Sequence, residues 1–168
     1  MGAHEAMGMK IDVITSFNEN YYQNIGRSCV ESWIAHWPSN LQLTVYIEEF
    51  SLNHNSRIRQ IDFDQVDANY WDFARWSTDR AARFAKKAYS FIHAMQHSQS
   101  DRIVWIDADV ITVNSVSWDF LYTLLPDDVL STHLGVVYDK NKTGQEGNWF
   151  VPETGFFAIN TQHKYFDR

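Results

Sequence analysis

The sequence predicts an α/β fold: a mostly parallel, twisted sheet flanked by helices and forming a single domain. Segments rich in Val and Ile alternate along the chain with segments whose apolar residues recur at helical spacing. The 168 residues suit one domain of ordinary size, and no linker or repeat divides them. The 45% of hydrophobic residues against 21% of charged residues is typical of a soluble globular chain rather than a disordered one.

The first half of the chain predicts a strand, a helix and a second strand. Lys10–Phe17 has the Val and Ile content of an interior strand, and apolar residues spaced along Tyr21–Trp37 predict a helix that Pro38 ends. Leu41–Phe50 alternates and is β-branched, so it predicts the next strand. Such a βαβ unit implies parallel strands joined by a right-handed crossover. Asn53–Thr78 mixes acidic and aromatic residues without a clean period, so we expect short helical turns and loops there.

The second half begins with a clear amphipathic helix. Apolar residues recur at helical spacing over Ala81–His97, and Thr78 or Asp79 is a suitable N-cap. The remaining predicted elements are a strand within Arg102–Val113, a helix near Ser117–Leu124, a strand over Val129–Asp139, a Gly- and Asn-rich loop over Lys140–Thr154 and a last strand over Gly155–Asn160.

Charge and cysteine content exclude several classes of protein. The formal charge of −7 argues against sequence-independent binding to a nucleic-acid backbone. Cys29 is the single cysteine, which excludes an intrachain disulfide and fits a reducing cytoplasm. No apolar run reaches the roughly 20 residues that a transmembrane helix needs. Residues 1–8 lack the apolar region of a signal peptide, so we expect them to be a leader or vector-derived and residues 9–168 to form the domain.

Two carboxylates interrupt the most hydrophobic stretch of the chain, "RIVWIDADVITV". Asp107 and Asp109 lie on the same face if the strand continues, and in the loop at its carboxyl end if it stops. Open α/β folds bind ligands at that end of the sheet. Two close carboxylates repel each other unless a cation lies between them, and Mg²⁺ or Mn²⁺ prefers oxygen ligands. A solvated surface turn is the alternative, but apolar residues on both sides of the pair argue against it.

Four segments together resemble a known family. "VWIDADVITV" resembles the hhhhDxDhhh motif of GT-A type glycosyltransferases, which bind nucleotide-sugars through a metal ion. "IDVITSFNENYY" resembles their first strand and its loop, and "RFAKKAYSFIHAM" resembles the R-F-x-x-K helix that precedes the motif. "ETGFFAIN" resembles the downstream strand that lines the sugar site in the glycogenin-like and lipopolysaccharide galactosyltransferase group. The resemblance covers about Lys10 to Asn160.

The resemblance implies a Mn²⁺ or Mg²⁺ site and a set of residues around a nucleotide-sugar. Asp107 and Asp109 would be the metal ligands, with Asp109 binding directly and Asp107 contacting the metal or the ribose. The residues implied to contact the donor are Thr15, Ser16, Phe17, Asn18, Arg83, Lys87, Asp107, Ala108, Asp109, Thr154 and Gly155.

Two residues are candidates for a catalytic role in that resemblance. Glu153 could act as a general base or hydrogen-bond a sugar hydroxyl. Arg83 could neutralise charge on the leaving phosphate, pair with Asp107, or form an ordinary salt bridge on the helix face. We expect the next two basic residues on that helix, Lys86 and Lys87, to be solvated, with Lys87 the better candidate for a phosphate ligand.

The function implied is transfer of a sugar, hexosyltransferase-like, from a nucleoside diphosphate sugar to a sugar, lipid or protein acceptor. Members of the family continue well past the last predicted strand, so we expect this chain to lack the C-terminal acceptor-binding part. One alternative is a catalytically silent nucleotide-sugar-binding module that a partner chain completes; another is a metal-dependent nucleotidyltransferase. A homodimer is compatible with the many aromatic residues, and a cytoplasmic location is expected.

Overall fold

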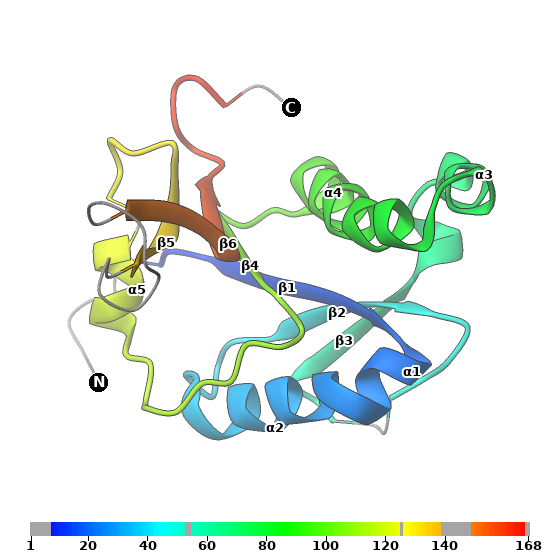
Figure 1. Ribbon diagram of the computed structural model, residues 1–168. Helices are drawn as coiled ribbons and strands as arrows, with labels where there is room; N and C mark the ends of the chain where they lie inside the picture. The colour runs from blue at the N-terminus through cyan, green and yellow to red at the C-terminus, as the bar shows by residue number, and fades with distance from the viewer. Residues whose placement is uncertain (1–7, 53–54, 125, 139–148, 167–168) are drawn as a thin grey trace.

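A six-stranded sheet in the order β3-β2-β1-β4-β6-β5 runs through the middle of the molecule (Figure 1). The computed structural model describes residues 8–52, 55–124, 126–138 and 149–166; within these ranges the side chains of residues 79, 80, 83, 134–138 and 149–154 are not described. The strands are β1 (Ile11–Asn18), β2 (Leu43–Glu48), β3 (Ile58–Asp62), β4 (Arg102–Ile106), β5 (Ser131–Tyr138) and β6 (Trp149–Asn160). The first four strands pair in parallel, and β6 pairs antiparallel with both β4 and β5.

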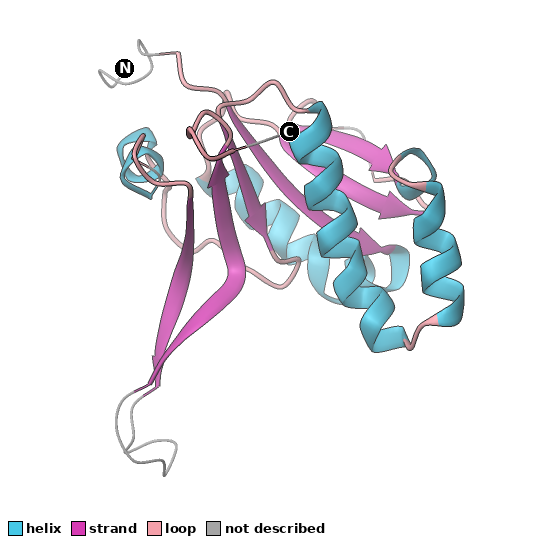
Figure 2. Ribbon diagram, turned by 90° about the horizontal axis from the view of Figure 1, so that it is seen from above, coloured by secondary structure: helices cyan, strands magenta, loops and turns pink. Residues whose placement is uncertain are grey.

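Helices cover both faces of the sheet. They are α1 (Glu19–Tyr21), α2 (Arg27–His36), α3 (Ala68–Trp76), α4 (Asp79–His97) and α5 (Trp118–Leu124). A π-helical segment, Tyr22–Gly26, joins α1 to α2, and a 3₁₀ turn, Phe63–Gln65, follows β3. Figures 1 and 2 show α3 and α4 side by side on one face of the sheet, with α2 on the other face.

Most of the predicted elements are confirmed, and two assignments are wrong. The strand, helix and strand of the first βαβ unit are present, and Thr78 caps α4 by accepting a hydrogen bond from the backbone N–H of Ala81. The segment expected to hold short helical turns and loops contains β3, a five-residue edge strand that pairs with β2, and the nine-residue helix α3. The loop prediction is wrong for Trp149–Thr154, which belong to β6, whereas its residues 140–148 lie outside the described part of the structure.

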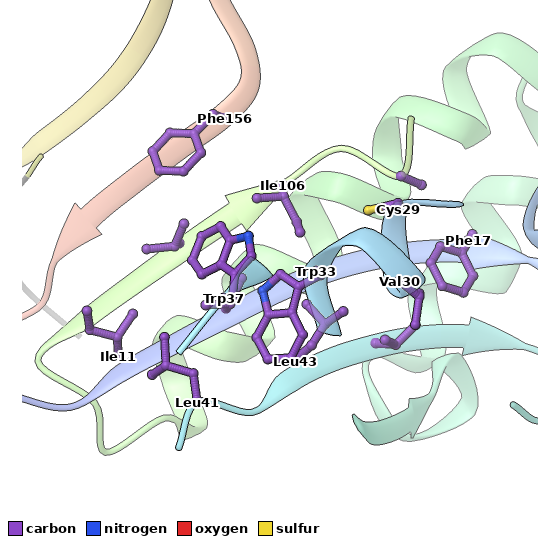
Figure 3. Close-up of a cluster of buried hydrophobic side chains, with 14 of the residues drawn as sticks. Ile11, Phe17, Cys29, Val30, Trp33, Trp37, Leu41, Leu43, Ile106 and Phe156 are labelled. Atoms are coloured by element: carbon purple, nitrogen blue, oxygen red, sulfur yellow. The ribbon is translucent and has the colours of Figure 1, made fainter. Parts of the chain in front are cut away.

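Two hydrophobic clusters hold the helices on the sheet. Between the sheet and α2, the fully buried Trp33 stacks on Trp37, with ring centroids 5.9 Å apart, and both lie against the side chains of β1 and β2 (Figure 3). On the opposite face, Tyr46 and Tyr70 belong to the cluster that packs α3 and α4. Alternate residues of β1 divide between the two clusters, so this strand is central to both.

Arg57 connects the end of α2 with the segment that leads to β2 through hydrogen bonds to backbone carbonyls. Its guanidinium donates hydrogen bonds to the backbone carbonyls of Ile34 at 2.7 Å, Pro38 at 2.7 Å, Trp37 at 3.2 Å and Leu41 at 3.3 Å. The same group lies 4.5 Å from the centroid of the Trp33 ring, a cation–π contact. The Ile34 carbonyl belongs to the last turn of α2 and the Trp37 carbonyl to its C-cap, where helix geometry leaves backbone acceptors without partners.

The topology determines where a ligand site is expected. The strand order reverses between β1 and β4, because β2 and β3 follow β1 on one side whereas β4 lies on the other. In open α/β sheets, the crevice outside the carboxyl ends of the strands at such a switch point is the usual binding site. Within the described ranges, no helix is both long enough and apolar enough to cross a bilayer.

Candidate functional site

A cavity of about 600 Å³ lies at the carboxyl ends of β1, β2 and β4, at the switch point of the sheet. Helices α3 and α4 supply the facing wall. The residues that line it are Ser16, Phe17, Asn18, Asn20, Tyr21, Glu48, Tyr70, Trp71, Ala74, Ala82, Phe84, Lys86, Lys87, Trp105, Asp107, Ala108 and Asp109. Among these residues, three carboxylates face two lysines, so the lining carries more acid than base.

The D-x-D segment forms a turn at the end of β4. The strand stops at Ile106, and the backbone N–H of Val110 donates to the carbonyl of Asp107 at 3.0 Å. The Asp107 N–H in turn donates to the carbonyl of Gly155 in β6 at 2.7 Å. Ala108 is buried in the core beneath, whereas Asp109 is exposed. Of the two arrangements open to the sequence, the structure has the one in which both acids follow the strand.

Asp107 is held by two side chains. The ammonium of Lys87 lies 2.9 Å from Asp107 Oδ1, and the indole N–H of Trp105 donates to the same oxygen. Lys87 also lies 5.2 Å from the centroid of the Trp105 ring. Both hydrogen bonds involve the same oxygen, Oδ1. The lysine therefore supplies part of the positive charge that the acidic pair requires.

A second polar cluster lies at the end of β2. Glu48 accepts hydrogen bonds from the hydroxyl of Tyr70 and from the ammonium of Lys86, each at 2.5 Å. The Glu48 and Lys86 side chains are only 11% and 13% exposed, so water screens this ion pair much less than a surface pair. Burial, reinforced by the hydrogen bond to Glu48 and its charge, raises the pKa of Tyr70, which keeps its hydroxyl a donor. Lys86 and Lys87 are thus both paired with carboxylates, and the expectation that they are solvated is wrong.

Cys29 supports the D-x-D turn from the core side. Its thiol donates to the backbone carbonyl of Asp107 at 3.7 Å, and the residue is 1% exposed. Burial raises the pKa of Cys29 to about 12, with the charges of Asp109 and Asp107 adding to the effect. Since the thiolate is the reactive species, this environment makes Cys29 a structural side chain and not a nucleophile.

We predict that Cys29 resists thiol-specific reagents in the folded protein. A rise in pKa from 9.0 to about 12 lowers the thiolate fraction at pH 8 roughly a thousandfold. Ellman's reagent should therefore modify the native protein far more slowly than the protein in guanidinium chloride. A comparable rate in both conditions would contradict the buried thiol.

The structure brings most of the predicted donor-contact residues of β1 to the cavity. Ser16, Phe17 and Asn18 line it, and Asn18 also caps α1 through a 2.8 Å hydrogen bond from Tyr21 N–H. Thr15 is fully buried and is not among the lining residues. Thr15 lies further from the carboxyl end of β1 than these three residues, within the buried part of the strand. Gly155 contributes its backbone carbonyl to the D-x-D turn.

Three predicted residues have side chains outside the described part of the structure. The backbone of Arg83 lies in α4, one turn before Lys87. The backbones of Glu153 and Thr154 lie in β6, directly before Gly155. Their assigned roles stay predictions.

The cavity contains residues that the sequence did not single out. Glu48, Tyr70 and Trp71 line it, yet each was read as part of a strand or of an irregular segment. A signal for Glu48 was present, because it is an acid at the carboxyl end of an otherwise apolar strand. Tyr70 and Trp71 come from α3, whose mixed composition hides which face turns inward.

The site fits a hard divalent cation in its donor chemistry. Asp107 and Asp109 offer carboxylate oxygens at the cavity wall, the ligand type that Mg²⁺ and Mn²⁺ prefer. Among the described side chains, no group of three or more His, Cys, Asp or Glu residues could hold a metal ion. A cation bound here would thus complete its shell from water or from a ligand's phosphates, which is usual for Mg²⁺.

Known proteins resemble this chain in structure and not in sequence. No protein-family model and no curated protein sequence matches it. The galactosyltransferase LgtC, solved with donor and acceptor sugar analogs, is 18% identical with a TM-score of 0.52, over 90% of this chain and 58% of that one. The mannosyltransferase Ktr4p from S. cerevisiae is 12% identical with a TM-score of 0.54, over 92% of this chain and 56% of that one. The bifunctional glycosyltransferase WbbM is 14% identical with a TM-score of 0.52, over 92% of this chain and 32% of that one.

The chain has the fold of these glycosyltransferases. The predicted α/β, GT-A-like architecture with a mostly parallel sheet is therefore confirmed. The chain spans between 32% and 58% of the length of the three solved structures. At these identities the likeness establishes the fold, so activity has to be argued from the residues of the site.

Proposed function

We propose that this chain is a metal-dependent glycosyltransferase, or the donor-binding part of one, that takes a nucleoside diphosphate sugar as donor. One observation carries the proposal: the Asp107–Asp109 turn lies in the wall of a cavity at the switch point of the sheet. Two acids at that place, opposite a lysine, suit a diphosphate and its cation. The fold shared with galactosyl- and mannosyltransferases supports this assignment.

Different residues along the cavity would contact different parts of the donor. Ser16 and Asn18 would hydrogen-bond the nucleoside at the end of β1, and Lys87 would donate to a phosphate oxygen. Mn²⁺ or Mg²⁺ held by Asp107 and Asp109 would neutralise charge on the departing diphosphate. Arg83, one turn before Lys87 on α4, is proposed to add a second positive charge there. Glu153, two residues before the Gly155 whose carbonyl contacts the D-x-D turn, is proposed to bind a sugar hydroxyl or act as a base.

In this proposal the acceptor of the sugar is another sugar, a lipid or a protein. A cytoplasmic location is proposed from the single buried, reduced Cys29. A homodimer is the proposed assembly in which a second copy could complete the site.

A nucleotide-sugar-binding module without activity of its own is the second candidate. In this candidate a partner chain would complete the site. Hydrolysis of the donor without acceptor distinguishes an enzyme from a binding module. Release of a nucleoside diphosphate rather than pyrophosphate excludes a nucleotidyltransferase.

Replacing Asp109 by asparagine tests the function directly. Mn²⁺ should raise the melting temperature of the unaltered protein further when a nucleoside diphosphate is present, and the Asp109→Asn variant should lose this metal-dependent increase. The reason is that the amide keeps the side chain's shape but removes the charge that holds a cation. The measurement is a thermal-shift screen of UDP, GDP, CDP and ADP with and without Mn²⁺.

The control is Asp128→Asn, which removes an equal charge from an exposed turn outside the cavity. It should respond to Mn²⁺ and nucleotide as the unaltered protein does. Metal-dependent binding that survives in Asp109→Asn would overturn the proposed site.

A further inference from the structure

Two consecutive lysines of α4 bind carboxylates on opposite sides of β1, but in different environments. Lys86 and Glu48 are 13% and 11% exposed, and both oxygens of Glu48 accept hydrogen bonds. Lys87 and Asp107 are 24% and 34% exposed, and their contact involves only one oxygen of the carboxylate. Both pairs line the cavity, and the Lys87–Asp107 pair is the more exposed of the two.

Lys87 and a divalent cation would compete for the same carboxylate. The ammonium is 2.9 Å from Asp107 Oδ1, so a cation held by the same carboxylate would lie close to it. Two positive charges at that separation repel each other, and the repulsion is stronger where water is partly excluded. A cation that arrives alone must therefore displace Lys87 or bind against its field.

We propose that Lys87 is an exchangeable counter-ion that occupies the cation's place beside Asp107 until a diphosphate binds and then moves to a phosphate oxygen. The inference rests on the proposed function, since it requires a cation and a diphosphate at this site. It assigns Lys87 a role in coupling the two, beyond that of a phosphate ligand.

Trp105 would keep the Asp107 carboxylate in position while Lys87 moves away. Its indole N–H donates to Asp107 Oδ1 and comes from β4, a strand buried along its whole length. When Lys87 leaves, this hydrogen bond still orients Asp107 toward the cavity. The Trp105 ring, 5.2 Å from the ammonium, also keeps Lys87 near the mouth of the site through a cation–π contact.

The exchange makes cation and diphosphate bind cooperatively. A diphosphate gives Lys87 a new anionic partner, which frees Asp107 for the cation, and linkage requires the cation to favour the diphosphate equally. Free metal would consequently bind weakly, and the metal–nucleotide complex would bind well. The site would distinguish the metal-loaded donor from free Mn²⁺ or Mg²⁺.

Lys87→Met tests the exchange, because it should shift the two affinities in opposite directions. The variant should bind Mn²⁺ alone about fivefold more tightly, since the competing charge is gone. It should bind the nucleoside diphosphate in saturating Mn²⁺ roughly tenfold more weakly, since a charge-assisted hydrogen bond is lost. Electron paramagnetic resonance of free Mn²⁺ measures the first affinity. Calorimetry with whichever of UDP, GDP, CDP and ADP binds the unaltered protein best measures the second.

Two further variants separate the possible outcomes. Lys164→Met removes the same charge from an exposed residue near the end of the chain and should change neither affinity. Lys87→Arg should weaken the binding of Mn²⁺ alone, because a guanidinium can grip a carboxylate through two hydrogen bonds. This second variant keeps the test available if Lys87→Met fails to fold.

Unchanged or weaker binding of Mn²⁺ alone to Lys87→Met, with weaker diphosphate binding, would overturn the exchange and leave Lys87 a simple phosphate ligand. The proposed function would survive that result. Failure of the unaltered protein to bind any of the four nucleotides with Mn²⁺ would instead overturn the proposed function itself.

Discussion

Replacing Arg57 by methionine is expected to lower the free energy of unfolding by about 4 kcal/mol. The guanidinium donates to the carbonyls of Ile34, Trp37, Pro38 and Leu41. Methionine fills much of the volume but donates no hydrogen bond, so partly buried carbonyls would lose their charged partner. Net contributions of about 1.5–3 kcal/mol for a hydrogen bond to a charged group make several simultaneous losses severe. Chemical denaturation followed by circular dichroism measures the change.

Two further variants show whether charge or geometry matters at Arg57. Arg57→Lys keeps the charge, but a single ammonium cannot reach carbonyls in as many directions as a planar fork, so we expect roughly half of the loss. Arg75→Met removes an arginine whose ion pair with Asp72 is 68% and 71% exposed, and it should cost at most about 0.5 kcal/mol. Equal stability of Arg57→Met and Arg75→Met would refute the structural role of Arg57.

Replacing Lys86 by methionine is expected to cost about 3 kcal/mol of stability. Glu48 would stay enclosed at 11% exposure with Tyr70 as its remaining partner, so its negative charge would lack a counter-ion. Removing one member of a buried pair is much more costly than removing both, because an uncompensated charge remains. Equilibrium denaturation in urea measures this loss.

The double variant Lys86→Met with Glu48→Gln separates charge from packing at this pair. It removes both charges while keeping the side-chain volumes similar, so it should recover most of the stability that Lys86→Met loses. A double variant as unstable as the single one would mean that Lys86 acts through packing of its aliphatic stem and not through Glu48.

The regular part of the fold was predictable because its signals are local. β1 and β2 carry runs of Val, Ile and Leu, and α4 shows helical periodicity over 19 residues behind a Thr78 cap. β3 was not predictable in this way, because "IRQID" has two apolar residues in five. Such a strand forms because β2 offers it a parallel partner, and that information lies elsewhere in the chain.

The site was predictable only where the residues themselves carry a pattern. Asp107 and Asp109 interrupt an apolar segment, so their placement at the end of a strand could be read from the sequence. The pairings of Lys87 with Asp107 and Lys86 with Glu48 join residues 20 and 38 positions apart, and they depend on how α4 lies across the sheet. No local signal in the sequence encodes that angle, which is why Lys86 was taken for a solvated residue.

The π-helical segment Tyr22–Gly26 allows one helical stretch to contact both the cavity and the hydrophobic core. Its π geometry accommodates an extra residue between α1 and α2. Tyr21 before it therefore faces the cavity, and Cys29 and Trp33 after it face the core. Shortening the segment by one residue would rotate the two sets by about 100° relative to each other. The rotation of this helical stretch about its axis therefore determines which of its residues line the cavity and which pack in the core.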